Sequence, residues 1–239
     1  MDTAKTAVFA YKNYGATVAI SWEEIRENSG SDHAIFDLVE HKRKNAMQSL
    51  KDRLNSDLYK AAPGAKEINS VPLTIDIDRS IGGINSTTET WWDAQRDATG
   101  GAFSAVGMTY MRGMYNDILA TGAGKPDQIM TTSTIHEAFE AEVDPDVRYV
   151  SVEGGTANRG FTKLMWKGIP IDFDSDCTAQ AMYFLNKNWL RLKVDSDGDF
   201  STDEFQSPVN QKVSVAKLCF RGQLITDNPR GLGIIKSLT

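Results

Sequence analysis

The pair His136-Glu137 is the first place where the residue types match a catalytic motif. In zinc peptidases such a pair opens a helix, and a second histidine one turn later completes the metal-binding face. Position 140 is Glu140, so the second imidazole is missing. We therefore interpret His136 as a surface or helix-capping residue, and we expect no zinc site there.

A glycine spacing typical of phosphate-binding loops occurs at Gly155 and Gly160. Phe161 stands where that motif requires the lysine that reaches the phosphates. Without this lysine the segment is better interpreted as an ordinary flexible loop.

An acidic stretch resembles the start of a calcium-binding loop, with Asp195, Asp197 and Asp199 at alternate positions. The sharp turn at its sixth position needs glycine but has Phe200, and Gln206 replaces the bidentate glutamate at the twelfth. We prefer a solvated acidic turn between two strands. A weak cation site within 195–204, with further oxygens from Asp203 and Glu204, remains an alternative.

The remaining nucleophilic and imidazole side chains form no recognisable constellation. There is no Gly-x-Ser-x-Gly nucleophile elbow. The sequence has three histidines, and His33 and His41 lie two helical turns apart, too far to share a metal ion. We therefore expect no enzyme, no catalytic residue, no cofactor and no metal.

Composition narrows the class of protein further. The 239 residues are 41% hydrophobic and 24% charged, which is typical of globular proteins and fits one large or two small domains. The formal net charge of −6 argues against a dedicated DNA or RNA reader. Cys177 and Cys219 are too few for a disulfide scaffold, and we expect reduced core thiols in a protein assembled in the cytoplasm. No stretch predicts a signal peptide or a membrane span.

The clearest predicted element is a long helix over 32–61. Capping residues occur at 28–32, apolar residues recur every three or four positions, and Pro63-Gly64 ends the pattern. Such a helix would be ~45 Å long, whereas a compact chain of this size has a radius of gyration of only ~18 Å. This contrast favours a flat or elongated molecule. Two shorter helices broken near 42–45 are the alternative.

The other elements predict an α+β fold rather than alternating βαβ units. Residues 6–22 alternate as a strand, 68–90 form a connector with short strands, and helices are expected over 102–120 and 134–143. Further strands are expected at 129–132, 147–152, 164–166, 169–173, 181–185, 190–194, 213–221 and 232–235.

The order of these segments resembles the major capsid protein of tailed bacteriophages, with the Hong Kong 97-type fold. The resemblance covers essentially the whole chain, and the long helix after a β-arm is its strongest element. The short stretches that carry it are Glu24, Asn28-Ser29-Gly30, the helix from Ile35 to Tyr59, Trp91-Trp92, Tyr115-Asn116, 124–130, 166–171, 182–186 and 220–224.

The resemblance implies a division of the chain. Residues 1–24 would belong to the extended loop that lies over a neighbouring subunit, and 25–90 to the peripheral domain, with spine helix 32–61. The axial domain would take 91–180. Strands at 181–212 would return to the peripheral domain, and 213–239 would supply the C-terminal strands of the axial domain.

The function implied is a structural one: self-assembly through pentamers and hexamers into the icosahedral head that encloses double-stranded phage DNA, without sequence-specific binding and without a membrane. The location would be the virion, after assembly in the host cytoplasm, with scaffolding, portal and decoration proteins as partners. An arm rich in aromatic residues suits an interface. The candidate intersubunit contacts are Phe9, Tyr11, Lys12, Tyr14 and Trp22; for Trp22, burial in the chain's own core is an equal alternative.

Two alternatives stay open: an encapsulin-like compartment shell of the same fold, and a soluble α+β binding domain that uses the acidic 195–204 stretch. The family pattern also has an arm and an outgoing strand ahead of the segment that matches Phe9–Trp22. We therefore expect a missing front end, and an unpaired strand near 6–22 that is disordered or pairs with another chain.

Overall fold

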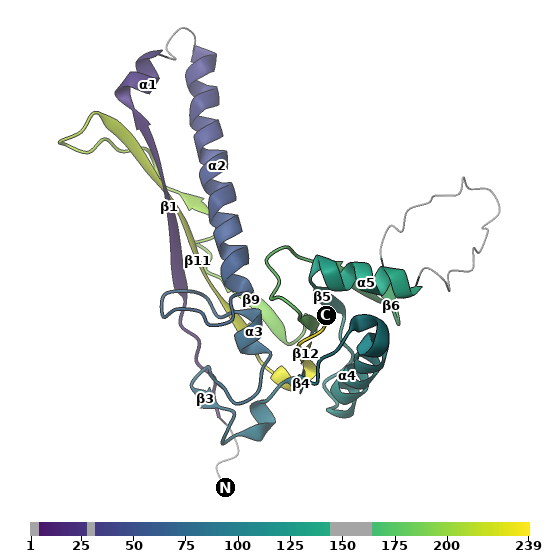
Figure 1. Ribbon diagram of the computed structural model, residues 1–239. Helices are drawn as coiled ribbons and strands as arrows, with labels where there is room; N and C mark the ends of the chain where they lie inside the picture. The colour runs from purple at the N-terminus through teal and green to yellow at the C-terminus, as the bar shows by residue number, and fades with distance from the viewer. Residues whose placement is uncertain (1–4, 28–31, 144–163) are drawn as a thin grey trace, which may run out of the picture.

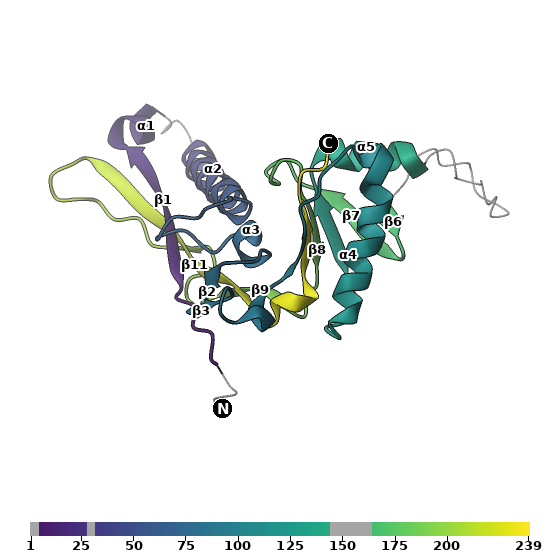
Figure 2. The ribbon, with the colours of Figure 1, turned by 60° about the horizontal axis from the view of Figure 1, so that its bottom comes forward.

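The computed structural model describes residues 5–27, 32–143 and 164–239. They form two bodies: a long helix that lies along an extended antiparallel ribbon, and a second sheet covered by helices (Figure 1). Seen from below, the two bodies form the arms of a V (Figure 2). The molecule is therefore elongated, as the long helix predicts. The strand expected at 147–152 and the glycine-spaced loop at 155–160 lie outside the described residues.

Helix α2 (Asp32–Leu58) is the predicted long helix, formed as one unbroken element. Its 27 residues span ~40 Å at 1.5 Å each. Leu50 and Leu54 are buried on the side that faces the ribbon, where they pack with Ile68, Leu218 and Phe220. The helix ends three residues before the predicted position, ahead of Pro63.

Strand β1 (Lys12–Ser21) is antiparallel to β11 (Val213–Thr226), and their register pairs Lys12 with Gly222 and Ser21 with Val213. The other edge of β11 holds β10 (Ser201–Thr202) and β9 (Leu190–Val194). The expectation of an unpaired strand is therefore wrong for 12–21. The hydrogen bonds come from β11, nearly two hundred residues away in the same chain. The sequence prediction considered only strands close to β1 along the chain and therefore missed this partner.

Alternation along β1 explains why it lies against α2. Val18 and Ile20 are buried beneath the helix, whereas Thr17 and Ala19 on the opposite face are exposed. After β1 the chain turns directly into the short helix α1 (Trp22–Glu27), where we had expected strand to continue to residue 22.

The second body contains a six-stranded sheet in the order β4-β12-β8-β5-β7-β6. Its strands are β4 (Gln95–Asp97), β5 (Gln128–Thr131), β6 (Met165–Trp166), β7 (Ile169–Phe173), β8 (Met182–Leu185) and β12 (Gly233–Ile235). Two of the pairings, β4 with β12 and β5 with β7, are parallel, and the others are antiparallel. The mixed sheet confirms the predicted α+β class.

Helices cover one face of this sheet. A π-turn segment η2 (Phe103–Gly107) leads into α4 (Met108–Ala120), and α5 (Ser133–Val143) lies beside it. Their core includes Phe103, Met111, Ile118, Phe139 and Phe184, all almost completely buried. The opposite face packs against α3 (Val71–Thr74) through Val71, Ile75, Tyr183 and Ile234. Both predicted helices are confirmed, with small shifts at their ends.

The connector at 68–90 contains a small hairpin, as expected, with β2 (Ser80–Ile81) and β3 (Ile84–Asn85). Two 3-10 turns complete the described elements, η1 (Thr90–Trp92) and η4 (Pro229–Gly231). No helix among the described residues is long and apolar enough to cross a membrane.

Strand membership refines the expected division of the chain. Strand β8 lies in the six-stranded sheet, although 181–212 was expected with the long helix. Strand β11 lies in the ribbon, although 213–239 was expected in the other body. The boundaries between the peripheral and axial domains stay a prediction.

Candidate assembly surface

The residues that resembled catalytic motifs do not converge on a site. His136 packs its ring against Phe173 with centroids 5.1 Å apart, and the ring of His41 contacts the Asn45 amide at 3.2 Å. Within the described ranges no group of three or more His, Cys, Asp or Glu side chains is arranged to hold a metal ion. The geometry thus offers no support for metal chemistry there.

The acidic turn after β9 is held by the protein's own groups. The Asp195 carboxylate lies 3.3 Å from the Arg221 guanidinium, and the Asp195 N–H donates to the Arg221 carbonyl at 2.9 Å. Phe200 takes a positive φ of 48° and packs its ring on Phe220 at 5.0 Å. This anchors the turn to β11, so the stretch behaves as a structural connection between strands.

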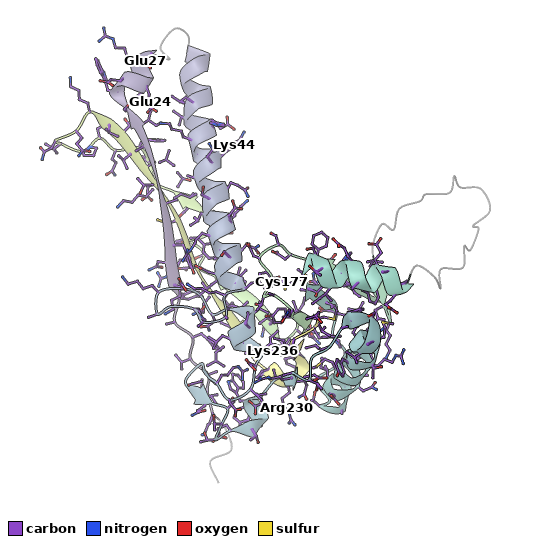
Figure 3. The ribbon with its side chains drawn as sticks, in the orientation of Figure 1. Glu24, Glu27, Lys44, Cys177, Arg230 and Lys236 are labelled. Atoms are coloured by element: carbon purple, nitrogen blue, oxygen red, sulfur yellow. The ribbon has the colours of Figure 1, made fainter. Side chains whose placement is uncertain are left out.

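Both cysteines are unpaired thiols. Cys177 is buried where the two bodies meet (Figure 3), and burial raises its pKa to about 12. Cys219 is only half-buried, on β11 opposite Gly15, so its assignment to the core holds in part.

The five candidate contacts of the arm divide into two groups. Phe9 is half-buried against Ile81, Ile84 and Trp92 of its own chain. The Tyr14 hydroxyl donates to Asp57 Oδ2 at 3.0 Å and accepts from the Ile68 N–H at 2.9 Å. Lys12 Nζ donates to the Ala65 carbonyl at 2.7 Å. These three side chains therefore already have partners within the subunit.

Tyr11 and Trp22 form the second group, with 44% and 45% of their surface exposed. Arg221 lies over the Tyr11 ring at 5.4 Å, and Arg26 and Lys212 lie 5.1 and 5.0 Å from the Trp22 ring. Aromatic rings beside cations are typical of protein interfaces. Their contact with a neighbouring copy stays a prediction.

The junction between β1, α1 and α2 is fixed by residues whose partnership sequence reasoning missed. Ser21 Oγ accepts from the Glu24 N–H at 3.2 Å, and Glu24 Oε2 accepts from the Ser21 N–H at 2.9 Å. This is the capping box that the spacing Ser-x-x-Glu signals. Lys42 of α2 then reaches Glu24 at 2.7 Å and the Ala19 carbonyl at 3.1 Å. The hydrogen bond from Lys42 is the main reason that the pKa of Glu24 is lowered.

A second missed contact ties α2 to the six-stranded sheet. Asn55 donates to the carboxylates of Asp174 and Asp176, with nitrogen–oxygen distances of 3.0 and 2.9 Å. One turn further, the Tyr59 carbonyl accepts from the Thr178 hydroxyl at 2.9 Å. The end of the long helix is therefore bonded to the loop between β7 and β8.

A buried arginine braces the connector beneath this junction. Arg79 is 7% exposed and donates to the carbonyls of Trp92 at 3.0 Å and Thr74 at 2.6 Å. Burial lowers its pKa to about 10. Nearby, Asp76 joins Lys236 at 2.6 Å and Arg96 at 3.2 Å. These contacts fasten the connector to β4 and to the segment after β12.

The surface also has a groove of about 580 Å³ between α2 and the segment after β10. Val39 and Phe205 give it an apolar lining, and Glu40, Arg43 and Glu204 add charges. Its location on the helix-and-ribbon body makes it part of the surface open to other molecules.

Comparison with solved structures identifies the fold. The chain superimposes on the capsid asymmetric unit of cyanophage A-1(L) with a TM-score of 0.77 and 17% identity, over 95% of this chain and 77% of that one. The capsid of an empty GTA particle matches with a TM-score of 0.58 and 14% identity, over 95% of this chain and 74% of that one. The chain therefore has the Hong Kong 97-type capsid fold, as the resemblance implied.

The same fold occurs in an encapsulin. The SrpI encapsulin of Synechococcus elongatus PCC 7942 matches with a TM-score of 0.61 and 10% identity, over 96% of this chain and 75% of that one. No protein-family model and no curated protein matches the sequence. The comparisons thus establish the fold, and function has to be argued from it.

Proposed function

We propose that this chain is the major capsid protein of a tailed phage, a structural subunit that assembles with copies of itself into the icosahedral head around double-stranded DNA. The observation that carries the proposal is the likeness to the cyanophage capsid over 95% of the chain. The geometry agrees, because an elongated subunit with a rigid spine suits a thin shell in which every subunit touches several others.

In this proposal the helix-and-ribbon body is the peripheral domain, and the six-stranded body is the axial domain whose loops meet around the symmetry axes. The pairing of strands into two separate sheets supports the division into two bodies. The names peripheral domain and axial domain are taken from the fold. No enzymatic role is proposed. The net charge of −6 suits a container that does not bind its DNA tightly. Portal, scaffolding and decoration proteins are the partners that such a head would need.

An encapsulin-like compartment is the second candidate, favoured by the match to the SrpI shell. The cyanophage capsid has the higher TM-score, 0.77 against 0.61. We therefore rank the phage head first.

Expression of the chain and sedimentation through a sucrose gradient tests the proposal. A shell subunit forms fast-sedimenting particles or rings, whereas a soluble binding domain stays at the position of its 26.4 kDa monomer. Expression within the complete set of head genes then separates the two shells: a phage head yields particles with nuclease-protected DNA, and a compartment yields particles with protein cargo.

Covalent crosslinking between subunits is a separate question. Some capsid proteins of this fold join a lysine to a neighbour's asparagine, and Lys5, Lys12, Asn186 and Asn188 fall in the corresponding regions. We carry none of that chemistry over. Ladders above the monomer mass on a denaturing gel of heated particles would show that crosslinks form.

A further inference from the structure

Three loops meet at one end of the six-stranded body: 121–127 after α4, 186–191 at the start of β9, and 227–231 with η4. Trp189 joins all three. Its indole N–H donates to the Ala123 carbonyl at 2.7 Å, and its own carbonyl accepts from the Asp227 N–H at 3.2 Å. The loops therefore form one surface, which we call the basic end.

The exposed charges of the basic end are mainly positive. Asp227 forms an ion pair with Arg191, and Asp127 accepts from the Lys187 N–H at 3.0 Å, so both carboxylates of these loops are used within the subunit. Three exposed cations have side chains without an ion pair or hydrogen bond to any described residue: Lys125, Lys187 and Arg230. This end is therefore positive, in a chain whose net charge is −6.

Helix α5 carries the opposite charge on its outer face. Ile135 and Phe139 are buried in the core, whereas Glu137 and Glu140 lie on the other side of the helix and are exposed. The sequence from 133 to 143 contains no lysine or arginine. In the part of the chain that the structure describes, neither glutamate has an ion-pair partner. The outer face is therefore negative.

This charge pattern is unfavourable for an isolated helix. Glu137 and Glu140 are three residues apart, a spacing at which like charges on a helix repel each other. Glu140 and Glu142 also lie in the last turn, where the helix dipole favours cations, and that turn has no basic residue. Both effects are relieved when cations lie against the outer face. The helix is therefore more stable against a positive surface than in water.

We propose that the basic end of one copy of this chain binds the outer face of α5 in the next copy, so that the six-stranded bodies join head to tail. The contact brings three cations against two carboxylates: Lys125, Lys187 and Arg230 against Glu137 and Glu140. Because the two surfaces differ, the contact is heterologous, and its repetition by rotation closes a ring.

The choice of a second copy rests on the proposed function, which surrounds each subunit with identical neighbours. Arg230 lies on the opposite side of the six-stranded body from α5 (Figure 3), and the turned view agrees (Figure 2). One subunit therefore cannot pair these two surfaces by itself. Charge complementarity favours a second copy over DNA, because DNA would match the basic end and leave the glutamates of α5 without a partner.

Zero-length crosslinking with a carbodiimide tests this on the wild-type protein. The reagent joins a lysine amine only to a carboxylate in direct contact with it. Associated protein should yield crosslinked peptides that join Lys125 or Lys187 to Glu137 or Glu140. In about 1 M salt, where the Debye length falls to about 3 Å, their yield should fall by about tenfold. Associated protein without these crosslinks overturns the inference.

Charge reversal tests each surface separately. The basic-end variant is Lys125→Glu with Lys187→Glu, and the helix variant is Glu137→Lys with Glu140→Lys. All four side chains are exposed, so both variants should keep a melting temperature near that of wild type. Each should weaken the association into rings by about tenfold or more, because like charges then meet at every contact.

The matched control reverses two exposed lysines of the helix-and-ribbon body, Lys66→Glu with Lys217→Glu. It changes the net charge as much as the basic-end variant does and should associate like wild type. An equal loss in the control would mean that net charge, and not this contact, governs association, which contradicts the inference.

Mixing the two variants tests the pairing itself. Alternating copies place opposite charges at every contact, so the mixture should recover rings of six but not rings of five, since an odd ring cannot alternate. A chain with all four changes should recover both. If the mixture of folded variants stays unassembled, the basic end binds something other than α5, and the inference is wrong.

The crosslinking result on the wild type decides if a variant does not fold. Shells without the crosslinks overturn only this inference, whereas crosslinked rings that never close into shells overturn only the proposed function.

Discussion

Lys42, near the middle of α2, forms an ion pair with Glu24 at the start of α1. This pair holds the end of the ribbon against the long helix. Glu24 lies far from the six-stranded sheet, whereas Cys177 lies beside it (Figure 3). Glu24 also completes the capping box of α1 by accepting from the Ser21 N–H, so one carboxylate stabilises both the helix start and the contact with α2.

The Glu24–Lys42 ion pair should make the stability of the folded protein depend on pH. Folding lowers the pKa of Glu24 below its usual value, so its contribution to stability is present near neutral pH and is lost as the pH falls through the folded-state pKa. We expect Glu24→Gln to lower the melting temperature at pH 7 and to lower it less at pH 3. Thermal unfolding at both pH values measures the difference, with the exposed Glu23→Gln as the control. An equal loss at both pH values would contradict the assignment.

The hydroxyl of Tyr14 bridges β1 and the segment after α2. Tyr14→Phe leaves the Ile68 N–H without its acceptor and Asp57 without one donor, so we expect a loss of about 1–3 kcal/mol in the free energy of unfolding. Denaturant titration measures it, and Tyr11→Phe, whose ring is exposed, is the control. A loss no larger than that of the control would show that the bridge contributes little.

Tyr14 also predicts behaviour at alkaline pH. Burial is the main cause that raises its pKa from 10.0 to about 12. The contribution of the Tyr14 hydroxyl to the stability of the fold is therefore complete below pH 10 and is lost as the pH rises through about 12. The stability advantage of wild type over Tyr14→Phe should shrink across this range, and an advantage that stays constant would argue against the raised pKa.

Leu54 packs α2 onto the ribbon at 8% exposure. Leu54→Ala should cost about 2–5 kcal/mol, because it removes buried methyl groups and leaves a cavity. Gln48→Ala, on the exposed side of the same helix, should cost far less. Chemical denaturation of both variants compares them; similar losses would mean that this helix face is not packed as described.

Trp22 should matter for assembly rather than for folding. Its side chain is 45% exposed, and Trp91 provides a matched control at 42%. We expect Trp22→Ala to keep the melting temperature of the monomer and to reduce the yield of particles, whereas Trp91→Ala assembles normally. Gradient sedimentation measures the yield. Equal yields from the two variants would remove Trp22 from the candidate contacts.

Local patterns predicted the elements well and the long-range partners poorly. The apolar period of α2 and the proline after it are properties of adjacent residues, so one helix could be recognised from them. The pairing of β1 with β11 depends on residues nearly two hundred positions apart, and nothing local to Lys12–Ser21 indicates that partner. The expectation of an unpaired strand was wrong for this reason.

The candidate contacts show the same limit. The aromatic residues of the arm could be selected as candidates from their type and spacing. Which of their side chains are exposed could not be predicted in this way. Phe9 finds a pocket formed by the connector hairpin, and Tyr14 finds Asp57 on the far end of α2. The capping box Ser21–Glu24 was the one missed feature with a local signal, since Ser-x-x-Glu marks a helix start.

Electron microscopy of the purified protein tests the central claim most directly. The account predicts closed, hollow icosahedral particles, or rings of five and six subunits, in which the long helix lies in the plane of the shell. A uniformly monomeric protein, at concentrations where the melting temperature shows that it is folded, would contradict the proposal that this chain is a capsid subunit.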